Sequence, residues 1–357
     1  MKIGYLTFDI DPKAGWGRYA SELISGIKNL GHEAVILKER DDGQEGLPIL
    51  KKGNKLLLSA LRIRKFLADC QIIHALDGYP FGIIAAISNL KLKKKLIITG
   101  VGTYAVAPLY NFLTAPLLKW AYKQANQVAA ISNFTKSQIL NKVKVKQIQV
   151  INPGFDFKKF YRQRLVGSQE FILSVGALKE RKGYHISIPA FALAKKQFPH
   201  LKYYIVGNQK DTGYFSSLKR IAQEHQVAND VIFLNDISDE ELAHWYASAK
   251  LFILTSVNFD HHFEGYGLVF LEAAAAGLPV VGTLNNGIGD VVQDNLNGFL
   301  VPQNDIQATA SALIKILTNN ELSSQFSLAS YAWAKQNDSA QAISAYLSLY
   351  ERLVGNN

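Results

Sequence analysis

The sequence predicts an α/β protein with two doubly wound, Rossmann-like domains. Apolar runs of strand length alternate with segments of helical periodicity along its 357 residues, and such alternation produces parallel sheets covered by helices. The alternation forms two series separated by a polar stretch at 158–169, and a chain of this length is long for one core. We expect an N-terminal domain over 1–164, a C-terminal domain over 165–335, and a last helix within 336–357 that packs back on the first domain.

Each series is built from short strands with helices between them. In the first series we expect strands at 2–8, 34–38, 72–76, 95–99, 127–131 and 147–151, a helix at 17–30, and a helix capped by Ser132. In the second we expect strands at 171–175, 203–206, 231–234, 251–254 and 280–282, and helices at 185–197, 214–225, 239–249 and 268–276. The last helix, about 341–353, has an amphipathic pattern typical of a packed helix. Ligands bind at the carboxyl ends of such strands, so we expect the active site in a cleft where the two domains face each other.

Composition excludes several classes of protein. With one cysteine, Cys70, the chain has neither a disulfide framework nor a cysteine zinc site, which fits a reducing cytoplasm. It lacks an uncharged apolar stretch of membrane-spanning length. The first nine residues have the pattern of a strand and not of a signal peptide.

The net charge of +10 is unevenly distributed. Residues 51–150 contain 16 Lys and Arg against Asp69 and Asp77, whereas residues 201–357 contain 8 basic and 16 acidic residues. A basic region of this kind attracts nucleic acid, anionic lipid or phosphorylated substrates, or is simply a solvated face without a partner.

Three short motifs have residue types suited to binding a phosphorylated ligand. Gly15, Trp16, Gly17 and Arg18 lie between the first strand and the first helix, where glycines allow a ligand to approach the backbone. This motif lacks the third glycine of the dinucleotide fingerprint, and a tight turn without a ligand explains it equally well.

The second motif follows the first strand of the second domain. It contains Gly176, Arg181 and Lys182. Two adjacent cations can neutralise a diphosphate, with Arg as a bidentate fork and Lys as a point charge. They could also stabilise the charge of a leaving diphosphate. A solvated loop is the alternative.

The third motif places Glu264 and Glu272 on either side of a Gly-x-Gly turn that leads into an alanine-rich helix. The helix, which begins near Gly267, directs its positive end at the ligand. Glu264 can accept hydrogen bonds from sugar hydroxyls, and the two oxygens of Glu272 can accept from the vicinal hydroxyls of a ribose. The alternative interpretation is a helix-terminal acid and a surface acid.

Histidines give weaker signals. His261 and His262 precede Glu264 and could suggest a metal site, but adjacent side chains point apart, so we expect a polar loop and no metal. His74 at a strand end could be catalytic, although a satisfied, partly buried histidine is commoner.

Together these motifs resemble retaining glycosyltransferases of family 4, which have the two-Rossmann GT-B architecture. The resemblance covers nearly the whole chain and rests on the order and spacing of seven segments, at 15–19, 130–136, 151–156, 176–183, 203–207, 264–272 and 277–282. It implies a metal-independent hexosyltransferase without a cofactor, whose donor is a nucleoside-diphosphate sugar and whose product retains the anomeric configuration.

The resemblance also implies a role for each matching residue. The catalytic residues would be Arg181, Lys182 and Glu264. The two cations would bind the donor diphosphate, and the carboxylate would contact the donor sugar. Glu272 would hold the ribose. The N–H groups of Tyr266, Gly267 and Leu268 would face the sugar and phosphate, and Gly176, Gly17 and Arg18 would complete the donor site. The acceptor side would include Gly15, Trp16 and Tyr104.

Two positions depart from the family pattern. Val101 occupies the place where many relatives have a histidine, which puts in doubt a histidine near the reacting carbon. Ala177 occupies the place of a frequent arginine, and Arg181 supplies a cation further along the loop.

The basic region suggests the acceptor. Cations beside the amphipathic, aromatic segment 105–122 suit an anionic membrane surface. We expect a cytoplasmic enzyme, peripheral on the inner face of the cell membrane, that glycosylates a lipid or a lipid-linked glycan in envelope glycolipid or polysaccharide synthesis. Alternatives are a soluble transferase acting on a sugar phosphate or small glycoside, a non-catalytic nucleotide-sugar sensor, and a basic nucleic-acid-binding protein. The last lacks a recognition motif, so we expect no nucleic-acid partner.

Overall fold

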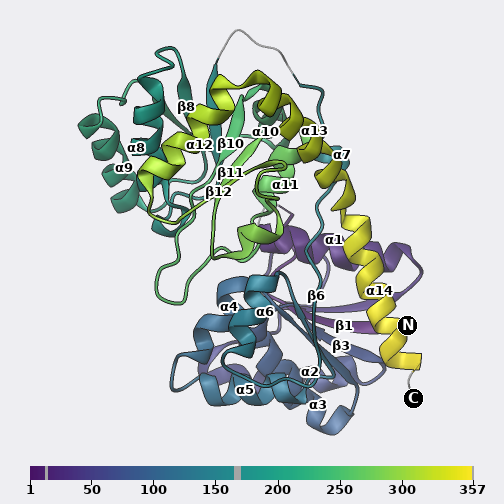
Figure 1. The fold of residues 1–357 in the computed structure, drawn as a ribbon. Coiled ribbons are helices and arrows are strands. Elements are labelled where there is room, and N and C mark those ends of the chain that lie inside the picture. The colour runs from purple at the N-terminus through teal and green to yellow at the C-terminus, as the bar shows by residue number, and fades with distance from the viewer. Residues whose placement is uncertain (13–14, 165–169, 356–357) are drawn as a thin grey trace. The chain divides into compact units, whose positions relative to one another are not determined.

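The computed structural model of the protein describes residues 1–12, 15–164 and 170–355. The chain forms two compact units, Met1–Gly154 with Ser339–Asn357, and Phe155–Asp338 (Figure 1). Each unit contains a six-stranded sheet flanked by helices, which confirms the predicted pair of doubly wound, Rossmann-like domains. The units divide earlier than the expected boundary after residue 164, and residue 165 on its far side lies outside the described residues. The predicted cleft between the domains stays a prediction.

The sheet of the first unit has the strand order β2-β1-β3-β4-β5-β6, with every neighbouring pair parallel. Its strands are β1 (Lys2–Thr7), β2 (Glu33–Lys38), β3 (Ile72–Ala75), β4 (Lys95–Gly100), β5 (Gln127–Ala130) and β6 (Ile148–Val150). The helices are α1 (Gly15–Asn29), α2 (Leu56–Leu67), α3 (Ile83–Leu92), α4 (Gly102–Val106), α5 (Ala115–Gln124), α6 (Asn133–Leu140) and α14 (Ser339–Gly355), with short turns η1 (Gly53–Lys55), η2 (Gly78–Gly82) and η3 (Ala107–Leu109).

The two faces of this sheet carry different helices. Tyr5 of β1 lies in a core cluster with residues of α1 and α14, whereas a side chain at Gly4 would collide with Leu67 of α2. Successive strand residues point to opposite faces, so α2 covers the face away from α1 and α14. Figure 1 shows α2, α3 and α5 together on that side.

The last helix belongs to the core of the first unit. Tyr346, Leu349 and Tyr350 of α14 are buried in the cluster beneath α1, and Ile343 occupies the space beside Gly26 where a side chain would otherwise stand. Figure 1 shows α14, in yellow, crossing α1, which it contacts. The amphipathic pattern of the last helix thus has a packing explanation.

The sheet of the second unit has the order β12-β11-β10-β7-β8-β9, again parallel. Its strands are β7 (Phe171–Val175), β8 (Lys202–Val206), β9 (Val231–Leu234), β10 (Leu251–Ile253), β11 (Val280–Thr283) and β12 (Gly298–Val301). The helices are α7 (Phe157–Phe160), α8 (Tyr184–Lys195), α9 (Thr212–Glu224), α10 (Asp239–Ser248), α11 (Leu268–Ala275), α12 (Ile306–Thr318) and α13 (Asn320–Gln336), with η4 (Glu180–Lys182) and η5 (Gly287–Asp290).

The observed elements match the expected ones closely. Each expected strand is present with ends within one residue of the prediction, and each expected helix with ends within two. Ser132 caps α6 as predicted, accepting a hydrogen bond from the Thr135 N–H at 3.0 Å. The sequence analysis missed strand β12 and the helices α2, α3, α4, α5, α7, α12 and α13. Across 1–12, 15–164 and 170–355, the helices are all too short or too polar to cross a membrane.

Candidate active site

The topology of the second sheet identifies where a ligand can bind. From β7 the chain crosses to β8 on one side, and from β10 it crosses to β11 on the other. The chain therefore leaves β7 and β10 in opposite directions, and the carboxyl ends of strands at such a switch point are where doubly wound sheets bind ligands. Arg181 and Lys182 follow β7, and Glu264 follows β10.

Two glycines hold the loop after β7 in place. Gly176, with φ of +152°, ends the strand, and its carbonyl accepts a hydrogen bond from the Tyr184 hydroxyl at 2.8 Å. Gly183 has φ of +70°, and a side chain there would collide with the carbonyl oxygen of Thr255. Only glycine combines this backbone conformation with so close an approach, so the loop packs directly against the segment after β10.

That packing brings Arg181, Lys182 and Glu264 together. Glu264 Oε2 accepts hydrogen bonds from Arg181 Nη1 at 3.0 Å and from Lys182 Nζ at 2.5 Å. The side chains of Lys182 and Glu264 are each 11% exposed, and that of Arg181 is 34% exposed. The solvated-loop interpretation of the two cations is therefore wrong for Lys182, which is buried and paired.

The electrostatics of this cluster are dominated by its burial and its charges. Burial raises the pKa of the Glu264 carboxyl, but the charges and hydrogen bonds of Lys182 and Arg181 outweigh that effect and hold the pKa at about 2. Burial, together with repulsion from Arg181, lowers the pKa of the Lys182 amine although Glu264 opposes the change. The cluster thus combines two cations with one carboxylate, a charge arrangement that attracts a further anion.

The turn after Glu264 has the backbone form that the glycines suggested. Gly267 has φ of +92° and is the N-cap of α11. Tyr266, which lies between Glu264 and Gly267, is 2% exposed. Its hydroxyl lacks a hydrogen-bond partner among the residues that the structure describes. Burial raises the pKa of this phenol, which keeps it protonated at neutral pH. Leu268 begins α11, so its N–H lies in the first turn of the helix.

Glu272 lies within α11 and is 7% exposed. The hydroxyl of Tyr246, in α10, donates to Glu272 Oε2 at 3.0 Å. The surface-acid interpretation of Glu272 is therefore wrong. The helix-terminal interpretation of Glu264 is also wrong, because this residue is buried and precedes the α11 N-cap by three residues. A buried carboxylate needs such donors.

The predicted glycine motif of the first unit forms the start of α1. A side chain at Gly17 would collide with Asp9 and the backbone of Asp11, so the turn itself requires this glycine, whatever it binds. Gly15 is exposed with open space around it. The Arg18 Nε donates to the Pro12 carbonyl at 2.9 Å.

Trp16 and Tyr104 are the other residues predicted for the acceptor side. Trp16 stacks on Tyr19 with ring centroids 4.5 Å apart, and its indole N–H is buried with no partner among the described residues. Tyr104, in α4, is 65% exposed. Both lie in the first unit, whereas Arg181, Lys182 and Glu264 lie in the second.

The histidines do not form part of this site. His74 is fully buried, with Nδ1 2.7 Å from the Tyr350 hydroxyl and Nε2 2.7 Å from Thr99 Oγ1. Burial lowers its pKa to about 3, so the ring is neutral and structural. His261 and His262 are exposed in a tight turn closed by backbone hydrogen bonds between Phe259 and His262. Within the described residues, the acidic, histidine and cysteine side chains form no group of three or more that could hold a metal.

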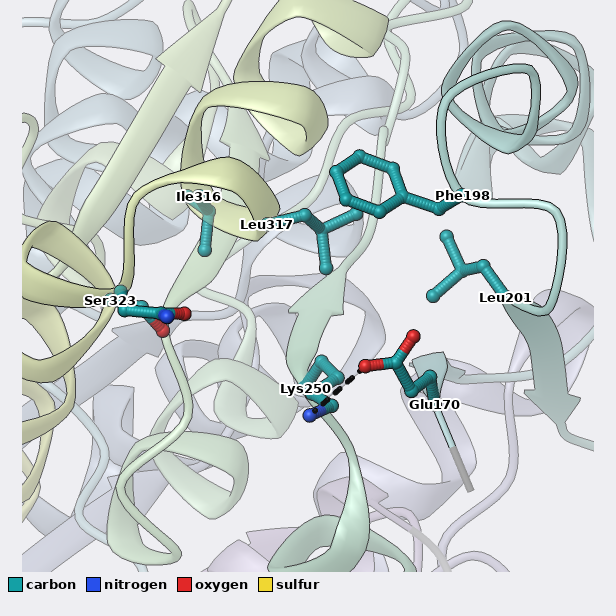
Figure 2. A pocket seen from close by; sticks show the side chains of 8 residues that line it. Glu170, Phe198, Leu201, Lys250, Ile316, Leu317 and Ser323 are labelled. Carbon is teal, nitrogen blue, oxygen red and sulfur yellow. Dashed lines mark ion pairs between the residues drawn. The ribbon is translucent and has the colours of Figure 1, made fainter. Parts of the chain in front are cut away.

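A cavity of about 90 Å³ lies at the opposite end of the second sheet. Figure 2 shows its lining, in which the ion pair of Glu170 and Lys250, 3.5 Å apart, stands below the apolar side chains of Phe198, Leu201 and Leu317. Glu170 and Lys250 immediately precede β7 and β10. The cavity is therefore at the amino ends of these strands, away from Arg181 and Glu264, and we do not assign it to the active site.

The sequence analysis missed two polar residues that contact the glutamates. Ser256 Oγ lies 3.4 Å from Glu264 Oε2, and it follows β10 as part of a Thr-Ser pair, a polar signal at a strand end that could have identified it. Tyr246 contacts Glu272, but a tyrosine within a helix has no comparable signal.

Comparison with known proteins supports the family resemblance. Residues 14–159 match Glycosyltransferase Family 4, and residues 156–333 match Glycosyl transferases group 1. An uncharacterized glycosyltransferase of Methanocaldococcus jannaschii is 23% identical over 94% of this chain and 93% of its own. A GDP-mannose-dependent alpha-(1-6)-phosphatidylinositol monomannoside mannosyltransferase of Mycolicibacterium smegmatis is 28% identical over 93% of each chain.

Solved structures show the same fold. Anabaena HepE in complex with UDP has a TM-score of 0.84 at 18% identity, over 98% of this chain and 99% of that one. WaaG, a glycosyltransferase involved in lipopolysaccharide biosynthesis, has a TM-score of 0.73 at 16% identity, over 99% of this chain and 100% of that one. With two family models that together span residues 14–333, two parallel Rossmann-like sheets and these neighbours, the chain belongs to the family 4 glycosyltransferases of GT-B architecture.

Proposed function

We propose that the protein transfers a sugar, with retention of configuration and without a metal, from a nucleoside-diphosphate sugar to an acceptor hydroxyl. The observation that carries the proposal is the buried cluster of Arg181, Lys182 and Glu264 at the carboxyl ends of β7 and β10. A solved structure of HepE contains UDP-glucose, and the name of the M. smegmatis relative specifies GDP-mannose, which supports a nucleotide-sugar donor here.

In the proposed donor site, different residues of the second unit bind different parts of the nucleotide sugar. Arg181 and Lys182 would neutralise the diphosphate, and Glu264 would accept hydrogen bonds from the sugar. The backbone N–H groups at the start of α11 would face the phosphate and sugar, where the helix dipole favours negative charge. Glu272 would accept from the ribose hydroxyls. Gly176 would allow the ligand close to the end of β7.

The chemistry follows from these charges. The bond between the anomeric carbon and the phosphate oxygen breaks, the acceptor oxygen bonds to the same face of that carbon, and the acceptor proton passes to the departing diphosphate. Negative charge grows on the leaving oxygen, and preorganised cations stabilise it most in the transition state. Arg181 and Lys182 supply two positive charges there, which is the basis for proposing a metal-independent reaction. Neither cation needs to act as a base.

For the acceptor we propose a hydroxyl on a membrane lipid or lipid-linked glycan, reached by an enzyme that is peripheral on the cytoplasmic face of the membrane. The basic region 51–150 supports an anionic surface as partner. The M. smegmatis relative is named for a phosphatidylinositol mannoside acceptor, and WaaG for lipopolysaccharide biosynthesis. Gly15, Trp16 and Tyr104 would contribute to this side, with Gly17 and Arg18 approaching the diphosphate.

A thermal-shift screen of nucleoside diphosphates and their sugars tests the donor assignment. A ligand at about 100 times its dissociation constant stabilises the folded protein by about 2.7 kcal/mol, a readily measured shift. Glu272→Ala should weaken donor binding, and Lys182→Ala should reduce kcat more than it raises KM. Glu224→Gln, on an exposed helix of the same unit, is the matched control. Absence of a shift with every nucleotide would refute the assignment, and NMR of the product anomer, with and without a chelator, tests retention and metal independence.

A further inference from the structure

Exposed apolar side chains gather on one part of the first unit. Of the eighteen large apolar side chains that are more than a third exposed in the described chain, ten lie between residues 57 and 140. They are Leu57, Leu58, Leu61, Leu90, Tyr104, Tyr110, Phe112, Leu113, Leu117 and Leu140. This stretch is about a quarter of the chain, so exposed large apolar side chains are more than twice as frequent in it as an even distribution would give. Most of them belong to α2 and to the segment 104–124, which ends with α5, and we call these two segments the basic apolar face.

The apex of this face is a turn that holds two apolar side chains in solvent. Phe112 is 82% exposed and Leu113 is 68% exposed. The Asn111 side chain accepts hydrogen bonds from the N–H groups of Leu113 at 2.9 Å and Thr114 at 3.3 Å, and the Thr114 hydroxyl donates to the Pro108 carbonyl at 2.7 Å. The backbone is therefore fixed, and the exposure of Phe112 and Leu113 is a feature of the folded turn.

The part of the chain that carries most of these side chains is rich in lysine and poor in acidic residues. Residues 78–155 contain ten lysines and neither aspartate nor glutamate. Lys119 and Lys123 lie on α5, the helix that also carries the exposed Leu117, and the Lys142 amine lies 3.8 Å from the ring centroid of Tyr110. On α2, the exposed Arg62 and Lys65 follow the exposed leucines. Exposed apolar groups in a lysine-rich, acid-free part of the chain complement a bilayer with anionic headgroups, which offers an apolar interior below a negative surface.

Other occupants fit this face less well. A second copy would bring the same lysines against each other, and like charges oppose that contact. Nucleic acid would pair with the cations but would leave Phe112, Leu113 and the α2 leucines in water, since its backbone is charged and hydrophilic. The combination of the exposed Phe112 and Leu113 with a lysine-rich, acid-free segment favours a membrane as the partner.

We propose that the basic apolar face docks the first unit on an anionic bilayer, with Phe112 and Leu113 inserted below the headgroups. The turn follows β4 and α4 in the chain, with Phe112 eight residues after Tyr104 and twelve residues after Gly100, the last residue of β4. An acceptor hydroxyl at headgroup depth would thereby approach the predicted acceptor side. The inference rests on the proposed function in taking the acceptor to be a lipid.

Vesicle sedimentation with the full chain tests the docking. We expect at least about tenfold stronger binding to phosphatidylcholine vesicles with about 30 mol % phosphatidylglycerol than to phosphatidylcholine alone, and a comparable loss of binding between about 50 and about 500 mM salt. Phe112→Ser with Leu113→Ser should weaken binding about tenfold, whereas Leu328→Ser, at a position 73% exposed in α13 of the second unit, should not. Unchanged binding by the double variant, equal binding to neutral vesicles, or no binding overturns the proposal.

Fluorescence locates the inserted residue directly. Cys70, the single cysteine of the chain, is buried, so Phe112→Cys can be labelled selectively with an environment-sensitive dye. Its emission should shift to the blue on addition of anionic vesicles, and that of labelled Leu328→Cys should not. A shift at both positions or at neither contradicts insertion of this turn.

Nucleotide thermal shifts on the same samples separate this inference from the proposed function. The double variant should keep the nucleotide response of the unchanged protein, because both altered side chains lie outside the second unit. A protein that responds to nucleotides but binds no vesicles refutes the membrane inference alone. Vesicle binding without any nucleotide response refutes the donor assignment alone.

Discussion

Replacing Glu264 by glutamine tests whether its charge holds the candidate site together. The pKa of Glu264 lies at about 2 instead of its ordinary 4.5, and each pKa unit corresponds to about 1.4 kcal/mol. The carboxylate therefore contributes about 3 kcal/mol to the stability of the second unit at pH 7. Glutamine has nearly the same volume but no charge, so Glu264→Gln should lower the free energy of unfolding by about that amount. The corresponding fall in Tm is roughly 6 to 12 °C.

The pH dependence of this loss provides a second check. The folded-state pKa of Glu264 is below its unfolded value, so its contribution is complete above pH 4.5 and is lost as pH falls toward 2. The difference between the unchanged protein and Glu264→Gln should shrink from about 3 kcal/mol at pH 7 to about 2 kcal/mol at pH 3.5. Denaturant unfolding followed by circular dichroism at both pH values measures it.

A matched substitution distinguishes the effect of removing a buried carboxylate from the effect of removing an exposed one. Glu224 pairs with Arg220 on an exposed helix of the same unit at 3.6 Å. Because exposed pairs contribute at most about 1 kcal/mol, Glu224→Gln should leave Tm nearly unchanged. If Glu264→Gln also left Tm unchanged, or if its effect did not vary between pH 7 and pH 3.5, the reasoning about the cluster would be wrong.

Two further substitutions test buried hydroxyls. Tyr266→Phe removes a hydroxyl that lacks a partner among the described residues, so it should raise the free energy of unfolding of the unliganded protein by about 1 kcal/mol; destabilisation in denaturant titrations would show that the hydroxyl is bonded after all. Tyr350→Phe removes the hydroxyl that lies 2.7 Å from His74 Nδ1 and 3.3 Å from the Tyr5 hydroxyl, so it should destabilise the first unit by about 1–3 kcal/mol. Ile343→Val in the same helix α14, which removes one methylene without touching a polar group, is its control, and equal losses in both variants would argue against a hydrogen-bonding role.

The strands were the most predictable part of the fold, for a physical reason. Parallel strands covered on both faces are continuous apolar, β-branched runs, and segments such as 171–175 therefore have clear ends. Helix α3 lies within an almost wholly apolar stretch, so periodicity does not mark it. Helix α12 has a regular apolar face and an Asp305 cap, and these signals could have revealed it.

The candidate site was predictable as residue types but not as contacts. Glycines and cations at strand ends indicated Arg181, Lys182 and Glu264 one by one. Their pairing depends on the carboxyl ends of β7 and β10 being neighbours, across a sequence separation of 82 residues between Lys182 and Glu264. Strand order in the sheet creates that proximity, and a single sequence does not display strand order.

The pairing changes how donor binding must be understood. In this structure the charges of Arg181 and Lys182 are already paired, because both side chains donate to the same oxygen of Glu264. In the proposed donor complex, the diphosphate would therefore share the two cations with a carboxylate that already contacts both of them. Under that proposal Lys182 would need little rearrangement, because its amine is already largely buried and Gly183 fixes its loop. Glu264 offsets part of the repulsion between the two cations in the folded protein. Under the proposed function, binding energy from the nucleotide would then remain available to stabilise the transition state.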